Sequence, residues 1–207
     1  MINEKDLDLV TILYQWSKEE REKHKREEGE VWIIDLVRCP LKRIFEEKFP
    51  EISESTIFSP SAIVGKLVHL GLENLLENKM ENVQIEFEGE KKIKIESEEV
   101  VVKGKIDVKI EDLGIEIKSA RADRGIPQEH HIDQVRAYNW LFDLKKTILI
   151  YVTPERITQY QISDRMDDNE VRTRILEEKA PRYDWECGYC PYSVLCPHKK
   201  SRESLTG

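Results

Sequence analysis

The chain has 207 residues, of which 39% are hydrophobic and 36% carry a charge, and its formal net charge is -8. A chain of this size can bury a core of its own, and because it has no long apolar run we exclude a membrane-spanning helix. The acidic balance argues against a uniformly basic surface, so any contact with nucleic acid has to depend on local groups of Lys and Arg.

The N-terminal quarter of the chain is predicted to be helical. Residues 18–30 are dense in Lys, Arg and Glu, which is typical of a solvated helix end or a mobile loop. A helix is predicted over residues 35–49, and it carries Cys39. The next helix is expected to begin near Ser59 and Pro60, because serine caps a helix and proline fits its first turn.

This next helix carries Gly65 and His69, which are four residues apart and therefore lie on one face. Histidine is a common metal ligand, but a single histidine on an amphipathic helix is more often an ordinary satisfied side chain. Taken alone, His69 favours the second interpretation.

Six strands and two further helices follow. The strands are predicted at residues 83–88, 91–96, 100–110, 114–120, 147–153 and 158–162, and the helices at residues 128–143 and 164–179. Internal repeats and low-complexity linkers are absent from the sequence. This alternation predicts one α/β domain with a mixed central sheet flanked by helices.

Two neighbouring strands carry a set of charged side chains. Asp107 lies on the first strand, and a short connection with acidic residues and Gly114 suits a tight turn back to the second. Side chains alternate along a strand, so Glu116 and Lys118 point the same way while Ile117 turns into the core. Two carboxylates then converge on one point, which suits Mg2+ or Mn2+, and the lysine can hold or polarise a water beside the metal.

The simpler explanation of this set is a solvated face, because charged residues on a hairpin of so charged a chain are usually exposed. The side chains between them favour a site instead, since they are apolar and typical of buried strands. They are Ile106, Val108, Ile115 and Ile117. A charge in a buried sheet is costly unless it is paired or bound to a metal.

The helix at residues 128–143 carries Gln134 and Tyr138 on one face, which on its own indicates an ordinary helix surface. Basic residues lie near these motifs, and each is most simply explained as surface. They are Lys118, Arg121, Arg124 and Arg136, followed by the basic tail at residues 198–202. Four aromatic residues are candidates to stack on unpaired bases, although core packing is the simpler role for most of them. They are Tyr138, Trp140, Tyr189 and Tyr192.

The four cysteines are spaced as one remote residue and a C-x-x-C-x5-C group; they are Cys39, Cys187, Cys190 and Cys196. The first residues contain no apolar signal region, so we expect a cytoplasmic protein with reduced thiols and a metal site rather than two disulfides. Zinc and an iron-sulfur cluster both accept four thiolates, and the spacing alone favours neither. Joining Cys39 to the tail closes a very long loop, which by the loop-entropy model stabilises the fold by about 5 kcal/mol.

In chain order the motifs are G-x-x-x-H, G-x-x-D, E-x-K and Q-x-x-x-Y, followed by the three-cysteine tail. This combination resembles the CRISPR-associated RecB-like exonucleases, the iron-sulfur branch of the PD-(D/E)XK nuclease superfamily. The resemblance extends over nearly the whole chain, from Cys39 to Cys196. Ile106 stands where the superfamily name implies a proline, a departure that is common in the RecB-like branch.

The resemblance implies roles for the motif residues. The implied metal ligands are His69, Asp107 and Glu116, and the implied catalytic residues are Asp107, Glu116 and Lys118. The implied DNA-binding residues are Gln134 and Tyr138. The implied cluster ligands are Cys39, Cys187, Cys190 and Cys196, which would hold a [4Fe-4S] cluster, with [2Fe-2S] or zinc as alternatives.

The resemblance further implies one nuclease domain in three parts. Residues 1–58 would form an N-terminal helical segment with Cys39, residues 59–180 the nuclease core and residues 181–207 the cluster-binding tail. The implied activity is Mg2+- or Mn2+-dependent cleavage of DNA, chiefly exonucleolytic on single strands from the 5′ end, with endonuclease activity as an addition. The implied setting is CRISPR spacer acquisition beside integrase proteins, and the chain is compatible with an oligomer.

Two alternatives belong beside this hypothesis. A nuclease of viral or plasmid DNA replication or recombination would carry the same motifs. A noncatalytic DNA-binding module that keeps the cluster is the other alternative, and the intact Asp107, Glu116 and Lys118 argue against it.

Overall fold

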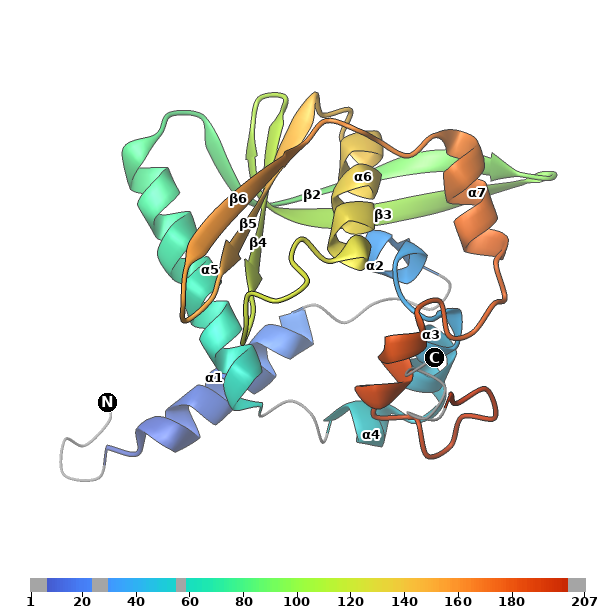
Figure 1. The fold of residues 1–207 in the computed structure, drawn as a ribbon, viewed down its shortest axis with the longest axis horizontal. Helices are drawn as coiled ribbons and strands as arrows, with labels where there is room; N and C mark the ends of the chain where they lie inside the picture. Colours follow the sequence, from blue (N-terminus) through green and yellow to red (C-terminus); the bar gives the residue numbers. More distant parts are fainter. Residues whose placement is uncertain (1–6, 24–29, 55–58, 201–207) are drawn as a thin grey trace.

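The computed structural model describes residues 7–23, 30–54 and 59–200, and it has a mixed sheet with helices on both faces (Figure 1). The strands are β1 (Val31–Trp32), β2 (Val83–Ile95), β3 (Glu98–Ile110), β4 (Leu113–Ser119), β5 (Lys146–Val152) and β6 (Ile157–Ile162). The helices are α1 (Leu9–Lys23), α2 (Ile33–Leu36), α3 (Pro40–Lys48), α4 (Pro50–Glu54), α5 (Pro60–Lys79), α6 (Glu129–Leu141), α7 (Asp168–Leu176) and the 3-10 helix η2 (Asp184–Gly188). The predicted α/β class with a mixed central sheet is confirmed.

Strand β3 organises the sheet. β2 pairs with β3 over the whole length of both strands. The other edge of β3 is shared, because β1 pairs with it in parallel at Val102 and Lys103 and β4 pairs with it antiparallel over residues 108–110. Residues 104–107 lie between these two partners, so the sheet opens at Asp107. Beyond β4 the sheet continues through β5, which is parallel to β4, to β6.

Apolar side chains bury the two faces of the sheet under different helices. Helix α5 covers one face, where Val68, Leu72 and Leu76 pack with Val108, Ile115 and Ile117. Helices α2, α6 and α7 cover the other face, where Ile33, Tyr138, Leu141 and Val171 pack with Ile106. Removing these side chains from water is the main stabilising contribution to the fold, at about 25 cal/mol per Å2 of apolar surface.

Two glycines allow the α6 side of the sheet to pack closely. A Cβ atom on Gly104 would lie 2.5 Å from Cδ2 of Leu141 and 2.8 Å from Cγ1 of Ile33. A Cβ atom on Gly89 would lie 2.8 Å from Cε1 of Phe142. The glycine of the G-x-x-D motif is therefore needed for packing, and it sets how closely β3 approaches α6.

The strands at residues 83–88 and 91–96 were predicted as separate, and this is wrong. They form the single strand β2, in which Gly89 and Glu90 pair with Gly104 and Lys103. Glycine in a sequence often marks a turn, but at Gly89 it makes room for Phe142. The other predicted strands agree with β3, β4, β5 and β6 to within two residues at their ends.

The single helix predicted over residues 35–49 is also wrong, because the chain forms α2 and then α3. Pro40 begins α3 and Cys39 is its N-cap residue. Proline disfavours helical backbone at the residue before it, so α2 cannot run on into α3.

The remaining helix predictions hold in part. α5 begins at Pro60 with Ser59 as the N-cap residue, although the Ser59 side chain makes no capping hydrogen bond. α7 is shorter than the predicted helix at residues 164–179, because the Asp167 side chain accepts a hydrogen bond from the Glu170 backbone N–H and so caps its beginning. Of the charged segment at residues 18–30, the first part is helical in α1, and residues 24–29 lie outside the described residues.

Helices α3 and α4 meet the C-terminal tail in what we call the cysteine lobe, made of α3, α4 and residues 181–200 (Figure 1). The Phe45 ring of α3 stacks on the buried Tyr192 ring of the tail, with ring centroids 5.7 Å apart. Arg182 of the tail donates from Nε to the backbone oxygen of Arg38 over 3.1 Å. Segments about 150 residues apart in the sequence thus form one unit.

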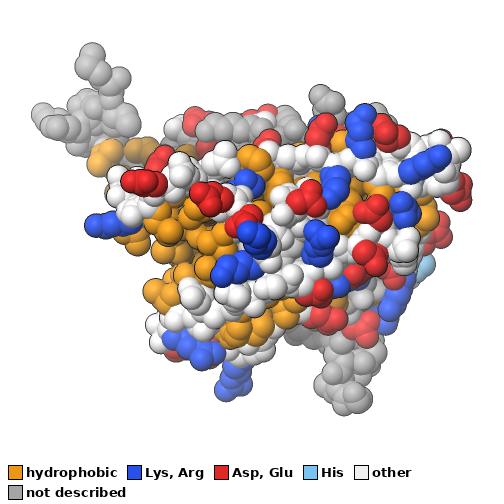
Figure 2. All heavy atoms as spheres, turned by 90° about the horizontal axis from the view of Figure 1, so that it is seen from above, with side chains coloured by type: hydrophobic (Ala, Val, Ile, Leu, Met, Phe, Trp, Pro, Cys, Tyr) orange, Lys and Arg blue, Asp and Glu red, His pale blue; other side chains and the backbone are white. Residues whose placement is uncertain are grey.

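The face seen from above carries basic and acidic side chains beside one another, with hydrophobic side chains gathered toward the left of that view (Figure 2). Four apolar side chains of α5 are at least half exposed; they are Val64, Leu67, Leu70 and Leu75. Among the described residues, no helix combines the length and the apolar character that crossing a bilayer requires.

Candidate active site and cysteine cavity

The site is centred on Asp107, at the point where β4 separates from β3. Oδ2 of Asp107 accepts a 2.6 Å hydrogen bond from the backbone N–H of Ile117. The carboxylate thus satisfies a backbone donor of β4 where the ladder between the two strands ends. Its other oxygen, Oδ1, lies 3.3 Å from Nδ1 of His69 on α5.

Glu116 and Lys118 point the same way from β4, as the strand period predicts. Nζ of Lys118 donates a 2.7 Å hydrogen bond to Oε1 of Glu116. Glu116 is 3% exposed, and its second oxygen, Oε2, is buried without a hydrogen-bond partner. Burial and the neighbouring charge of Asp107 raise the pKa of Glu116. A buried carboxylate oxygen left in this state is costly, so the site is suited to a cation.

His69 belongs to this site although its helix pattern alone favoured an ordinary satisfied histidine. Burial lowers the pKa of His69, but the hydrogen bond and charge of Asp107 outweigh burial, and the net shift is upward. Gly65, one turn earlier on α5, lies next to Ser119 at the end of β4, where a Cβ atom would be 3.9 Å from Cβ of Ser119. The G-x-x-x-H motif therefore lies on the face of α5 that meets β4.

Glu73 is a member of the site that the sequence analysis missed. It is one turn after His69 on α5 and 6% exposed, and its Oε1 lies 4.0 Å from Nδ1 of His69. Ligand atoms of His69, Glu73 and Asp107 all lie within 4.8 Å of one another. Burial and the charge of Asp107 raise the pKa of Glu73 to about 7. The H-x-x-x-E spacing was a signal for Glu73, but it is hard to distinguish in a chain with 41 acidic residues.

Gln134 and Tyr138 lie on α6 and connect to the site through Lys118. Nζ of Lys118 donates to Oε1 of Gln134 over 2.9 Å, and Nε2 of Gln134 donates to the Tyr138 hydroxyl over 3.0 Å. Gln134 is 7% exposed and Tyr138 is 5% exposed. Gln134 therefore contacts the lysine directly and Tyr138 contacts Gln134, while the contact of both side chains with DNA stays a prediction.

The donor set determines which cation the site suits. It offers carboxylate oxygens from Asp107, Glu116 and Glu73 and one imidazole from His69. Hard oxygen donors suit Mg2+ and Mn2+ better than soft metals, which prefer thiolates. The residues present therefore fit a divalent metal of this kind.

The other basic and aromatic candidates divide into surface and structural residues. Arg136 lies in ion pairs with Asp164 and Glu170, and Arg121 and Arg124 are exposed after β4. Tyr138, Trp140 and Tyr192 are at most 5% exposed, which confirms core packing for three of the four aromatic candidates. Tyr189 is 82% exposed. Residues 201 and 202 of the basic tail lie outside the described residues.

The four cysteines meet in the cysteine lobe. All four line one cavity of about 250 Å3; they are Cys39, Cys187, Cys190 and Cys196. None of the four is in a disulfide. Burial raises the pKa of Cys39 and of Cys190.

Glu186 holds the two parts of the cysteine lobe together. Its Oε1 accepts a 2.7 Å hydrogen bond from the backbone N–H of Cys39, and its Oε2 accepts a 3.0 Å bond from the backbone N–H of Tyr183. One side chain of the tail therefore fixes the start of α3 beside the C-x-x-C segment. The backbone N–H of Lys200 lies 3.5 Å from Sγ of Cys187, a kind of contact that also stabilises thiolate ligands of metal clusters.

Comparison with known proteins places the chain among nucleases. It is 38% identical over 200 residues to the CRISPR-associated exonuclease Cas4 of Saccharolobus solfataricus, covering 92% of this chain and 98% of that protein. The crystal structure of SSO0001 superimposes with a TM-score of 0.89 and 36% identity, covering 94% of this chain and 99% of that one. No protein-family model matches the chain.

Proposed function

We propose that this chain, which belongs to the family of the CRISPR-associated exonuclease Cas4, is a metal-dependent deoxyribonuclease of the RecB-like kind. One observation carries the proposal. The buried Oε2 atom of Glu116 has no hydrogen-bond partner, and it belongs to a side chain close enough to Asp107 for the two charges to interact. A cation at this point would relieve both the unpaired oxygen and the repulsion between the carboxylates.

The residues that would hold the metal are His69, Asp107 and Glu116. Glu73, within reach of the first two, adds a fourth group. When bound there, Mg2+ or Mn2+ supplies a Lewis acid that polarises the scissile phosphate and lowers the pKa of a water ligand. The backbone of β4 keeps Asp107 in place through the Ile117 N–H, so the carboxylate needs no rearrangement to act as a ligand.

Lys118 would stabilise the charge that develops during cleavage. An ammonium group has three donor hydrogens, and two of them are directed at Oε1 of Glu116 and Oε1 of Gln134. These two bonds orient the third hydrogen, which can donate to the attacking water or to a phosphate oxygen. Gln134 therefore acts as a positioning residue for the lysine, with the Tyr138 hydroxyl fixing its amide in turn.

The cysteine cavity would hold an iron-sulfur cluster, most simply [4Fe-4S]. The four thiols line a cavity of about 250 Å3, which has room for a cluster of several atoms. A single zinc ion needs less space, because its four thiolate ligands lie about 2.3 Å from the metal. The size of the cavity therefore favours the cluster. A cluster there supplies a cross-link between α3 and the tail. Hydrolysis of a phosphodiester is not a redox reaction, so the proposed reaction requires only a structural role of the cluster.

The finer parts of the proposal concern substrate and setting. We expect chiefly exonuclease activity on single-stranded DNA from the 5′ end, with endonuclease activity as an addition. The Cas4 relative is named as CRISPR-associated, which supports a role in trimming DNA captured for spacer acquisition beside integrase proteins. An equivalent nuclease could serve viral or plasmid DNA replication.

The test measures degradation of single-stranded and duplex DNA, labelled at the 5′ or the 3′ end, by the purified protein with and without Mg2+ or Mn2+. We expect metal-dependent cleavage that Asp107→Ala or Glu116→Ala abolishes and Lys118→Ala reduces by about 10^2- to 10^3-fold. His69→Ala and Glu73→Gln should raise the metal concentration needed for half-maximal activity.

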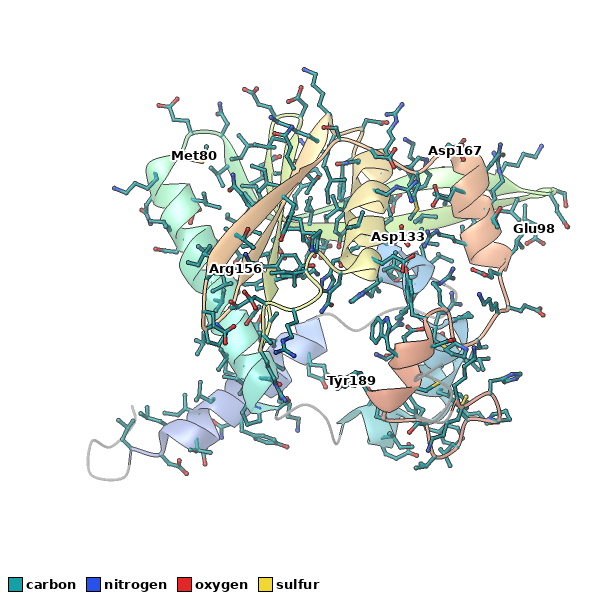
Figure 3. All side chains as sticks on the ribbon, viewed as in Figure 1. Met80, Glu98, Asp133, Arg156, Asp167 and Tyr189 are labelled. Atoms are coloured by element: carbon teal, nitrogen blue, oxygen red, sulfur yellow. The ribbon has the colours of Figure 1, made fainter. Side chains whose placement is uncertain are left out.

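The matched control is Glu98→Ala, which removes an exposed carboxylate at the tip of the β2–β3 hairpin (Figure 3). It should leave turnover and metal requirement unchanged. If wild-type protein binds DNA but does not cleave it under any metal condition, the nuclease hypothesis is wrong and the noncatalytic DNA-binding module takes its place.

A further inference from the structure

A row of aromatic rings runs from the beginning of α6 to the surface of the cysteine lobe. The rings of His131 and His130 have centroids 4.0 Å apart, and the His130 ring is 4.7 Å from Trp185 of η2. Trp185 stacks on Tyr183 at 5.8 Å with an interplanar angle of 18°, and it meets the Tyr189 ring edge-on at 6.4 Å. Five rings from two distant parts of the sequence are thus in contact, with Tyr183 and Tyr189 both meeting the Trp185 ring.

The outer end of this row is exposed. Trp185 is 42% exposed and Tyr189 is 82% exposed, whereas Trp140 and Tyr192 are buried. Figure 3 shows Tyr189 at the margin of the lobe, on the side that faces α1 in this view. Large aromatic side chains are mostly buried in folded proteins, and those that stay exposed next to a functional site are typical of binding surfaces.

The exposed tryptophan has a rigid base. The Tyr183 ring stacks on Trp185, and its hydroxyl donates a 2.8 Å hydrogen bond to Oδ2 of Asp133. Asp133 is 9% exposed and also accepts a 2.9 Å bond from Arg174. A ring fixed in this way loses little conformational freedom when a ligand stacks on it.

The inner end of the row lies beside the proposed active site. His130, Gln134 and Tyr138 are successive at intervals of four residues, so they lie along one face of α6. His130 is therefore four residues, about 6 Å along the helix axis, from the glutamine that contacts Lys118. Burial and then the charge of Lys118 lower the pKa of His130 to about 4, which agrees with this proximity and keeps the ring neutral.

We propose that Trp185 and Tyr189 form a stacking platform for unpaired bases of single-stranded DNA, which leads the strand along His130 toward the Lys118 end of the active site. This inference rests on the proposed function and specifies how its substrate is held. Aromatic rings stack on any base but only when the base is unpaired, so the platform selects single strands over duplex.

Charge near the platform matches the backbone of such a strand. Lys42 lines the cysteine cavity together with Trp185 and Tyr189, and Lys199 and Lys200 are exposed at the end of the described tail. Two carboxylates of η2 are already engaged, since Asp184 pairs with Lys200 and Glu186 accepts two backbone hydrogen bonds. A phosphate group beside a stacked base can therefore meet Lys42.

The experiment measures binding of fluorescein-labelled oligothymidylate and of a labelled duplex by fluorescence anisotropy, without added divalent metal so that the DNA is not consumed. The variants are Trp185→Ala and Tyr189→Ala, with Tyr189→Phe as the variant that keeps a ring. Val194→Ala, at an exposed apolar position of the same tail, is the matched control. Iron content and thermal unfolding are recorded for each variant.

We expect each alanine variant to lose about tenfold or more in affinity for the single strand, in line with loss of one base stack, and to change little for duplex. Tyr189→Phe and Val194→Ala should bind like wild type. Wild-type affinity in Tyr189→Ala and Trp185→Ala, or an equal loss for duplex, would overturn the platform. Loss of iron in Trp185→Ala with normal binding by Tyr189→Ala would overturn it too, because the ring would then only cover the cysteine cavity. Metal-dependent cleavage by wild type is scored separately, so either hypothesis can fail alone.

Discussion

The Tyr183 hydroxyl donates a 2.8 Å hydrogen bond to Oδ2 of Asp133, and this bond joins the cysteine-bearing tail to α6. Asp133 directly precedes Gln134, which contacts Lys118. Arg174 of α7 donates to the same Asp133 oxygen over 2.9 Å. The cysteine lobe and the helix that positions the proposed catalytic lysine therefore share one buried ionic group.

Removing the hydroxyl should weaken this connection. Tyr183→Phe is expected to lower the free energy of unfolding by about 1.5–3 kcal/mol, because the lost bond ends on a charged, buried acceptor. Thermal or urea unfolding followed by circular dichroism measures the change. Tyr189→Phe removes an exposed hydroxyl and should unfold like wild type; equal stability of Tyr183→Phe and Tyr189→Phe would refute the connection.

Gln134→Ala should lower turnover more than substrate affinity. The variant removes the acceptor that orients Nζ of Lys118, and loss of a group that positions a catalytic residue typically costs about 10- to 100-fold. Steady-state cleavage of labelled DNA separates kcat from KM. Gln159→Ala, at an exposed position on β6, is the matched control. A changed KM with normal kcat would make Gln134 a substrate contact instead of a positioning residue.

The charged set on β3 and β4 could be predicted because local geometry determines it. A two-residue connection between Ile110 and Leu113 fixes how the strands face each other, and the strand period directs Glu116 and Lys118 together. His69 and Asp107 meet only because α5 packs on β3 and β4, so their contact followed from the family resemblance and not from spacing.

Other parts of the molecule depend on contacts that sequence patterns do not encode. The link between Asp133 and Tyr183 spans 50 residues and depends on how the tail folds back onto α6. Gly89 has the same local appearance as a turn glycine, and only the position of Phe142 explains it. Trp185 was overlooked because its exposure results from the arrangement of η2 beside α6, which no local rule predicts.

The variant Cys39→Ser is expected to lose the cluster and to have a lower free energy of unfolding than wild type. Anaerobically purified wild type is expected to be brown, with broad absorbance near ~400 nm and about four irons per chain. Cys39 is the proposed ligand at the start of α3, so its loss would reopen a loop of about 150 residues and should lower the free energy of unfolding by several kcal/mol.

Cys187→Ser separates the loss of the cluster from the loss of the cross-link, because the other two proposed ligands of the tail, Cys190 and Cys196, remain and can keep the link to Cys39. Absorbance, iron content and thermal unfolding of the two variants are compared under anaerobic conditions. Colourless wild-type protein that contains zinc would refute the iron-sulfur cluster. Equal stability of Cys39→Ser and wild type would refute the stabilising cross-link.

The stability of the protein should fall in moderate acid through His131. Burial, and then the charges of Lys118 and His130, lower the pKa of His131 to about 2, whereas an unfolded histidine has a pKa of about 6.5. Below about pH 6.5 the unfolded chain therefore binds a proton that the folded protein does not, and stability decreases as the pH falls toward 4. The slope from this one imidazole approaches about 1.4 kcal/mol per pH unit.

The variant His131→Gln removes this titrating group. The difference in free energy of unfolding between wild type and variant should therefore become less favourable to wild type between pH 7 and pH 4. Because Glu73, Glu116 and His130 are present in both proteins, the difference reports on His131 and on its interaction with His130. Thermal unfolding measured across this range checks the prediction, and parallel profiles for the two proteins would show that His131 binds its proton as readily in the folded protein as in the unfolded chain.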